Sequence, residues 1–171
     1  MARARAGCDA HRVLEMCLHA CERVLPPARG SIGALRIAGK DDLDLLTTWG
    51  EEFVADAGLP PGHDQRAIAQ RHVAAQAAHF WDVDGRPVSM AIATGATPTG
   101  MRIGGVYTPR GLRGQGHASA CVAALTQRLL DAGRRRCFLY TDVANPTSNA
   151  IYRRLGYVPV ADYEEWRFGV G

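Results

Sequence analysis

Apolar and polar residues alternate along the chain with two periods, which together predict a mixture of helices and strands. Apolar positions three and four residues apart indicate amphipathic helices, whereas alternation at every second residue indicates half-buried strands. Helices are expected over residues 9–25, 41–57, 64–78, 116–132 and 145–155. Strands are expected over residues 35–37, 79–83, 88–93, 101–108, 137–141, 157–160 and 165–168. Strands interleaved with helices around one sheet place the chain in the α/β or α+β class.

Glycine, proline and asparagine residues mark several element ends. Asp84-Gly85 predicts a tight hairpin, and Gly104-Gly105 inside a strand predicts a bulge or a close backbone approach. Gly133 stands where a left-handed residue commonly ends a helix. Asn145 followed by Pro146 is a strong helix start, with the asparagine as the cap and the proline at the first helical position.

The first 30 residues are predicted to be an appendage to the main domain. An apolar stripe at helical spacing, from Val13 to Val24, predicts one amphipathic helix over residues 9–25. Pro26-Pro27 ends this helix and begins a stretch with the composition of a linker. We therefore expect an N-terminal helical extension over residues 1–30 and a single folded domain over residues 31–171.

The composition fits a folded domain and argues against several other classes. Of the 171 residues, 47% are hydrophobic and 22% are charged, which excludes a wholly disordered chain and a coiled coil. No stretch approaches the 18 or so consecutive apolar residues of a transmembrane helix, so no membrane partner is expected. The net charge of +3 favours anionic ligands weakly and is far below that of a nucleic-acid-binding domain.

The five cysteines predict reduced thiols rather than disulfides. An odd number of cysteines without a recognisable secretory signal is typical of a cytoplasmic protein. Cys17, His19 and Cys21 with His11 could suggest a metal site, but the two cysteines lie one helical turn apart in the apolar stripe. Core packing is the better interpretation, and no metal is expected.

A glycine-rich loop between a predicted strand and a predicted helix is the first candidate for chemistry. Residues 106–118 read Val-Tyr-Thr-Pro-Arg-Gly-Leu-Arg-Gly-Gln-Gly-His-Ala. Unpaired backbone N–H groups and the positive end of the helix dipole favour a phosphate at such a place. Gly114 and Gly116 let the backbone approach a ligand closely, and Arg110 and Arg113 add positive charge. The Gly-Lys pair of a Walker motif and the third glycine of the dinucleotide fingerprint are both absent from the loop.

The helix expected after Asn145 is the second candidate. Asn145 and Tyr152 are seven residues apart, which is close to two helical turns, so both face the same side of the helix. A polar cap residue and a phenol on one face are able to contact one ligand.

Together the two segments resemble the signatures of the GNAT N-acetyltransferase superfamily. Residues 113–118, Arg-Gly-Gln-Gly-His-Ala, are similar to its Gln/Arg-x-x-Gly-x-Gly/Ala motif. Residues 145–157 are similar to its second signature, an Asn, a Tyr seven residues later and then Leu-Gly-Phe/Tyr. The resemblance covers residues 33–168 and looks closest to the FR47-like branch. Longer members of that branch carry another N-terminal domain, which this chain is expected to lack.

The resemblance implies a fold, a donor and a set of binding residues. The fold would be a mixed central sheet flanked by helices, with two splayed central strands near Gly104-Gly105. The donor would be acetyl-CoA, whose pantetheine arm would pair with the backbone of Val106, Tyr107 and Thr108. The pyrophosphate would be held by backbone N–H groups from Arg113, Gly114, Gln115, Gly116, His117 and Ala118. Asn145 would contact the pantetheine or the adenosine.

The reaction that the resemblance implies is direct attack of a primary amine on the thioester. A backbone N–H near Tyr107 would stabilise the oxyanion. Tyr152 would lie at the thioester sulfur, and its phenol is a competent proton donor to the departing thiolate. The base stays open, because the strand before the loop carries no carboxylate or histidine. The candidates are Glu51, Glu52, Asp142, Glu164 and His79. The first two, with Asp56, are also candidate anchors for a cationic amine.

Other functions stay open. The chain could bind acyl-CoA without catalysis, and the missing base on the central strand motivates this alternative. The N-terminal apolar stripe could dock on another chain, as in a partner subunit or a homodimer. A nicotinamide-dependent enzyme is disfavoured by the glycine spacing. For the enzyme, a small-molecule or peptide amine is the expected acceptor.

Overall fold

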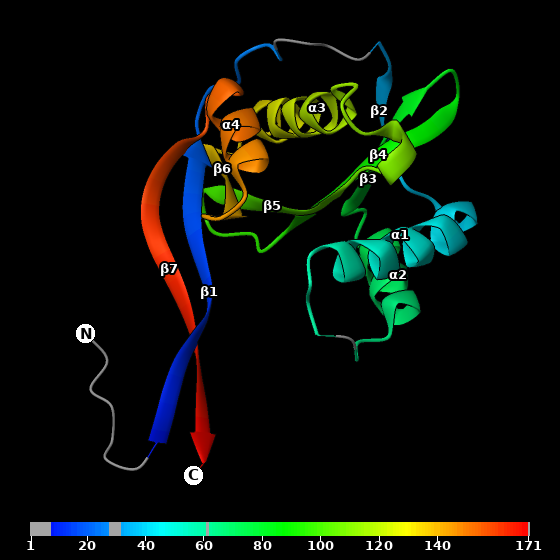
Figure 1. The fold of residues 1–171 in the computed structure, drawn as a ribbon. Coiled ribbons are helices and arrows are strands. Elements are labelled where there is room, and N and C mark those ends of the chain that lie inside the picture. The colour runs from blue at the N-terminus through cyan, green and yellow to red at the C-terminus, as the bar shows by residue number, and fades with distance from the viewer. Residues whose placement is uncertain (1–7, 28–31, 61, 171) are drawn as a thin grey trace.

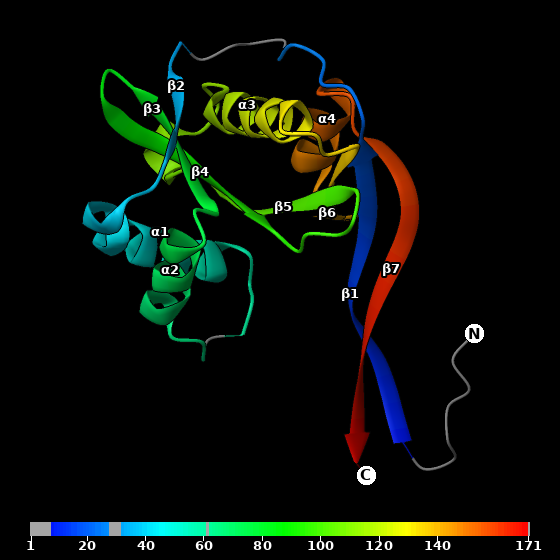
Figure 2. The same ribbon diagram turned by 180° about the vertical axis from the view of Figure 1, so that it is seen from behind.

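The computed structural model describes residues 8–27, 32–60 and 62–170, and it shows one mixed sheet with helices on both faces (Figure 1; Figure 2). The sheet has seven strands in the order β2-β3-β4-β5-β6-β1-β7. The strands are β1 (Cys8–Cys21), β2 (Ala34–Ile37), β3 (Ala78–Val83), β4 (Arg86–Thr94), β5 (Gly100–Tyr107), β6 (Arg136–Asp142) and β7 (Val158–Val170). The helices are α1 (Leu43–Asp56), α2 (Gln65–Ala74), α3 (His117–Asp131) and α4 (Pro146–Arg154). Within these ranges no helix is long and apolar enough to cross a membrane.

The predicted turn and cap residues are confirmed. Asp84 and Gly85 have φ values of 50° and 73° and form the tight turn between β3 and β4. Gly133 follows α3 with a φ of 90°. The Asn145 side-chain oxygen caps α4 by accepting a hydrogen bond from the Ser148 backbone N–H at 3.0 Å. These features depend on neighbouring residues, which explains why the sequence predicts them well.

The predicted helix over residues 9–25 is wrong, because residues 8–21 form strand β1. β1 lies between β6 and β7 and runs antiparallel to both. His19 and Cys21 are buried. The expected N-terminal helical extension is therefore a strand of the main sheet. The boundary at residue 30 stays a prediction, and residues 28–31 of the expected linker lie outside the described residues.

Two hydrophobic clusters pack on opposite faces of the sheet. The larger cluster joins α3 and the end of α4 to the strands, with Cys121, Leu125 and Leu155 fully buried. The smaller cluster joins α1 and α2 to β3, β4 and β5 around Trp49 and Phe80. Both views show α1 and α2 well separated from β1 and β7 (Figure 1; Figure 2). The sheet is therefore covered on one face along most of its width and on the other face mainly at β3 to β5.

The parallel strands β5 and β6 diverge toward their carboxyl ends, as the resemblance implies. Residues 100–102 of β5 pair with residues 136–138 of β6. Beyond this ladder, β5 continues to Tyr107 and β6 to Asp142. A bulge bends β5 here, because β5 has one residue more than β4 between the pairs Ile92–Gly104 and Met90–Tyr107. The splay opens beside the loop that enters α3.

Candidate active site

The glycine-rich loop leads from the end of β5 to the start of α3. Gly114 and Gly116 have φ values of 79° and 84°, in the left-handed region that favours glycine. Gly116 is the N-cap of α3 and makes no side-chain cap, so the first N–H groups of the helix lack intrahelical partners. A Cβ atom at Gly114 would meet nothing within 4 Å. Open space at Gly114 beside the positive end of α3 fits an anionic group, whereas the Arg113 backbone N–H donates to the Arg110 carbonyl at 3.4 Å.

One carboxylate at the end of α1 holds both arginines of the loop. Arg110 donates to Asp56 Oδ1 through Nη2 at 2.5 Å and Nε at 3.2 Å. Arg113 donates to Asp56 Oδ2. The hydrogen bonds from Arg110 and Arg113 hold the pKa of Asp56 below its usual range. Two guanidinium groups and one carboxylate leave a net positive charge beside the loop. Asp56, a candidate amine anchor, is bonded here to the loop arginines.

Arg113 and Tyr107 connect the loop, the end of β5 and α1. Arg113 Nε donates to the Thr108 carbonyl at 2.9 Å, and its guanidinium lies 5.6 Å from the centroid of the Tyr107 ring. The Tyr107 hydroxyl donates to Glu52 Oε2 at 2.8 Å. Burial, and then the neighbouring Glu52 carboxylate, raise the pKa of Tyr107. These contacts fix the residues at which the pantetheine arm is expected.

A buried serine of β4 adds a second set of contacts to the same strand end. The Ser89 hydroxyl donates to the Tyr107 carbonyl and accepts from the Thr108 hydroxyl, both at 2.9 Å. Val106, the third residue expected at the pantetheine, packs against the cluster around α3. The backbone of the expected binding residues is thus held from β4 and from α1.

α4 places Tyr152 against the start of α3. Tyr152 is half-buried, and its ring packs edge-on to that of Tyr157 at a centroid distance of 5.9 Å. Burial, and then the nearby Cys121 thiol, raise the pKa of Tyr152 to about 12. The phenol therefore stays protonated near neutral pH, as a proton donor must. No hydrogen bond among the described residues joins Tyr152 or Asn145 to β5 or to the loop. His117 is buried in the first turn of α3.

Asn149 is a positioning residue that the sequence analysis did not identify. Its Nδ2 donates to the carbonyls of Asp142 and Asn145 at 3.0 and 2.8 Å. Its Oδ1 accepts from the Thr141 hydroxyl at 2.6 Å. Asn149 therefore ties the start of α4 to the end of β6. The signal in the sequence is a second asparagine one helical turn after the capping Asn145, which gains meaning only once the path of β6 is known.

Burial and ion pairing disfavour two of the five base candidates. His79 is buried on β3, and burial lowers its pKa. Glu164 lies on β7 and accepts from Arg12 at 3.0 Å, which holds the pKa of Glu164 below its usual range. A carboxylate held ionised by an arginine is a weaker base.

Glu52 and Asp142 lie at the ends of the two diverging strands, Glu52 through its bond to Tyr107. Glu51 and Glu52 are both exposed on α1, and Glu52 accepts from the Tyr107 hydroxyl at the end of β5. Asp142 is the last residue of β6, and its Oδ1 accepts from the Ala144 backbone N–H at 2.7 Å. Of the five candidate bases, Glu52 is therefore the one bonded to the end of β5, and Asp142 is the one at the end of β6.

The four cysteines whose side chains the structure describes offer no activated nucleophile. Cys17, Cys21, Cys121 and Cys137 have free thiols. Burial raises the pKa of Cys121 to about 12, and a thiol of such high pKa is largely unreactive. Among the described residues, no group of three or more His, Cys, Asp or Glu side chains is placed to hold one metal ion.

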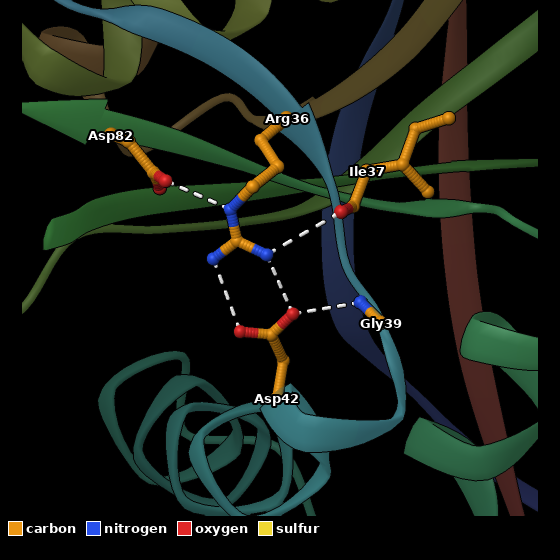
Figure 3. A network of polar contacts seen from close by, with 5 residues as sticks. All are labelled: Arg36, Ile37, Gly39, Asp42 and Asp82. Atoms are coloured by element: carbon orange, nitrogen blue, oxygen red, sulfur yellow. Dashed lines mark hydrogen bonds and ion pairs between the residues drawn. The ribbon is translucent and has the colours of Figure 1, made fainter. Parts of the chain in front are cut away.

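A second arginine cluster fixes the beginning of α1 (Figure 3). Arg36 of β2 donates to both oxygens of Asp42, through Nη1 at 2.6 Å and Nη2 at 3.1 Å. Its Nε donates to Asp82 Oδ2 of β3 at 2.8 Å, and its guanidinium lies 5.3 Å from the Phe80 ring centroid. The helix that carries acidic residues to the glycine loop is therefore anchored at both ends.

Comparison with known proteins agrees with this geometry. The sequence profile of the acetyltransferase (GNAT) family matches residues 44–157, well over half of the chain. A search of curated protein sequences returns no significant match. The matched range contains the splayed strands, the glycine loop and α4.

Solved structures share the fold. A protein from Novosphingobium aromaticivorans described as a GNAT-family acetyltransferase gives a TM-score of 0.69 at 16% identity, covering 98% of this chain and 69% of that one. A GCN5-related N-acetyltransferase from Sphaerobacter thermophilus gives 0.73 at 19% identity, covering 93% of this chain and 53% of that one. A structure from Clostridium acetobutylicum, described as a predicted acetyltransferase with acetyl-CoA, gives 0.56 at 16% identity, covering 72% and 88%.

The chain spans 69% of the length of the Novosphingobium aromaticivorans protein and 53% of the length of the Sphaerobacter thermophilus protein. Identities this low establish a common fold, and the FR47-like branch stays a prediction. The profile match covers both segments that carry the signatures. The chain belongs to the GNAT acetyltransferase family.

Proposed function

We propose that the protein transfers the acetyl group of acetyl-CoA to a primary amine by direct attack within a ternary complex. Membership of the GNAT family implies acyl transfer from acetyl-CoA. The observation that supports the proposal most is the divergence of β5 from β6 beside the open N-terminus of α3. The relative from Clostridium acetobutylicum, which was solved with acetyl-CoA, supports the choice of donor.

The chain supplies distinct binding groups for the two ends of the donor. Backbone N–H groups from Gly114 to Ala118 would bind the pyrophosphate, next to the net positive charge of the Arg110, Arg113 and Asp56 cluster. The backbone from Val106 to Thr108 would bind the pantetheine. Acetyl-CoA supplies the acetyl group as a thioester when bound.

Two side chains would move the protons of the reaction, one as the base and one as the acid. The amine nitrogen forms a bond to the carbonyl carbon as the carbon–sulfur bond breaks. Glu52 would take the proton that the amine loses, directly or through one water. Tyr152 would protonate the departing thiolate and recover its proton from solvent. Its raised pKa keeps it protonated until this step.

Calorimetric titration of acetyl-CoA into the purified protein tests the donor site. Gly114→Asp and Gly116→Asp place a negative charge and a side chain in the loop, so binding should be lost while the fold, measured by circular dichroism, is retained. Thiol release with a panel of small amines and peptide N-termini then tests turnover. Binding without turnover for every amine would favour the alternative of a non-catalytic acyl-CoA-binding module.

The neighbouring glutamates of α1 give a matched test of the base. We expect Glu52→Gln to lower kcat about 100-fold, because it removes the proton acceptor at the end of β5. Glu51→Gln changes an exposed residue of the same helix and should leave kcat unchanged. If both variants keep full activity, Asp142 becomes the base to test by Asp142→Asn.

Tyr152→Phe tests the acid. It should lower kcat at least about tenfold at every pH from about 6 to 9, with no change in the shape of the profile. The reason is that a phenol with a pKa near 12 does not titrate in this range. A variant with full turnover would exclude Tyr152 as the proton donor.

A further inference from the structure

The outer half of the β1–β7 ribbon carries exposed aromatic residues on an edge strand. β7 is the last strand of the sheet, and Trp166 and Phe168 in its outer half are 43% and 58% exposed. β6 pairs with the inner half of β1, from Met16 to Cys21, so the ribbon extends past the rest of the sheet (Figure 1; Figure 2). Two-stranded ribbons are marginally stable in water, and the unpaired backbone N–H and C=O groups of an edge strand are a template for another strand.

The charges of this ribbon fall into two groups. Arg12 of β1 pairs with Glu15 and Glu164, both at 3.0 Å. Glu165 and Arg167, which flank Trp166, make no ion pair among the described residues. When two copies of such a strand pair antiparallel about the residue between the two charges, the acidic residue of each copy lies opposite the basic residue of the other.

We propose that two copies of the chain associate through the outer halves of their β7 strands, paired antiparallel about a two-fold axis at Trp166. In this register Trp166 lies opposite its counterpart. Glu165 of each copy lies opposite Arg167 of the other, so the symmetry forms the ion pair twice.

The neighbouring register is less favourable. A shift by one residue sets Glu164 against Arg167 of the second copy. Glu164 already accepts from Arg12 at 3.0 Å and from Trp166 Nε1 at 3.1 Å within its own chain. The register at Trp166 instead uses Glu165 and Arg167, which have no ion-pair partner among the side chains that the structure describes. Because these two charges complement their own copies, we take the occupant to be a second copy of the chain. None of the residues proposed for acetyl transfer takes part.

Sedimentation velocity over a roughly hundredfold range of protein concentration tests the proposal. We expect a monomer–dimer equilibrium in which Glu165→Arg or Arg167→Glu alone weakens the dimer at least about tenfold. The double variant Glu165→Arg with Arg167→Glu restores the ion pairs with reversed sign and should recover the dimer. Arg154→Glu makes an equal charge change on an exposed residue of α4 and should leave the dimer unchanged.

The charge reversal distinguishes this interface from association through any other surface of the protein. A chain that stays monomeric at every concentration overturns the proposal, as does a dimer that neither single reversal weakens. Loss of the dimer in both single variants and in the double variant would also overturn the proposal. In the register at Trp166 the double reversal again sets opposite charges against each other and should restore the dimer. Circular dichroism of each variant establishes that the exposed substitutions leave the fold intact.

Discussion

The two ends of α1 are anchored by arginine–aspartate clusters of opposite composition. At the start of the helix, one arginine, Arg36, is shared by the carboxylates of Asp42 and Asp82. At the end of the helix, one carboxylate, Asp56, is shared by two arginines. The first cluster carries a net charge of −1 and the second a net charge of +1. The first lies between β2, β3 and the helix, whereas the second lies on the surface beside the glycine loop.

The difference in solvent exposure separates the roles of the clusters. The Asp42 and Asp82 side chains are 16% and 15% exposed, so removal of their cation leaves two shielded carboxylates without compensation. The Arg110 side chain is 80% exposed, and exposed ion pairs contribute little to stability. The net positive charge of this cluster beside the glycine loop nevertheless attracts an anionic ligand. The same chemistry should therefore control stability at one end of α1 and ligand binding at the other.

The largest expected effect is on stability at the start of α1. Arg36→Met should lower the free energy of unfolding by about 2 kcal/mol, less than for a fully buried pair because Arg36 is partly exposed. Urea denaturation measures this change. Arg36→Lys keeps the charge but loses the two-pronged contact with Asp42, and about half of the loss is expected. An unchanged unfolding midpoint in Arg36→Met would remove the distinction between the clusters.

Local signals explain which parts of the fold the sequence predicts. The Asn145 cap and the Asp84-Gly85 turn depend on adjacent residues, so their patterns are visible without the fold. β1 depends on partners far along the chain, because Cys21 pairs with Cys137 and Ala20 with Val158. Apolar residues occupy both faces of this segment, so the helical period fits its sequence as well as the strand period does. Tertiary pairing decides between them.

The features of the candidate site also divide into local ones, which the sequence predicts, and long-range ones, which it does not. The glycine loop is predicted because its glycines and arginines are consecutive in the sequence. The contact of Asp56 with Arg110 is not predicted, because 54 residues separate them and the contact requires α1 to pack beside β5. Glu52 could not be separated from the other carboxylates for the same reason, since it is distinguished by its hydrogen bond from the Tyr107 hydroxyl, 55 residues away in the sequence.

The second largest effect is expected within the loop cluster, where the two arginines differ. Arg113 bonds Asp56 and the Thr108 carbonyl and lies over the Tyr107 ring. Among the described residues, the side chain of Arg110 bonds only Asp56. Arg113→Ala should weaken acetyl-CoA binding about tenfold, and Arg110→Ala about twofold. Calorimetry measures both dissociation constants. Equal effects of the two variants would mean that charge alone, and not the contact with β5, determines binding.

A smaller effect of opposite sign is expected for Asp56→Asn. This change keeps the shape of the side chain and raises the net charge beside the loop, so acetyl-CoA should bind about threefold more tightly at low salt. The gain should vanish at high salt, where the Debye length falls to about 3 Å. The urea midpoint should not change. Weaker binding by Asp56→Asn would show that Asp56 positions Arg113, and the end of α1 would then act through geometry rather than charge.

The smallest effect concerns the acid side of the stability curve. Hydrogen bonds from Arg36 hold the pKa of Asp42 below its usual value of 3.8, so the folded state binds protons less readily than the unfolded chain. The stabilisation is complete above the unfolded pKa and is lost as the pH falls through the folded pKa. Between pH 7 and pH 4 only the start of this loss is sampled, and Asp42 should contribute about 0.3 kcal/mol to it.

Urea titrations of the wild type and of Asp42→Asn at the two pH values measure that contribution. The wild type should lose slightly more stability on acidification than Asp42→Asn, because the variant has no carboxylate to protonate at this position. Arg36→Met should also show a smaller loss than the wild type, because the cation that lowers the pKa of Asp42 is absent. If both substitutions leave the loss of unfolding free energy between pH 7 and pH 4 unchanged, Arg36 holds Asp42 by shape rather than by charge.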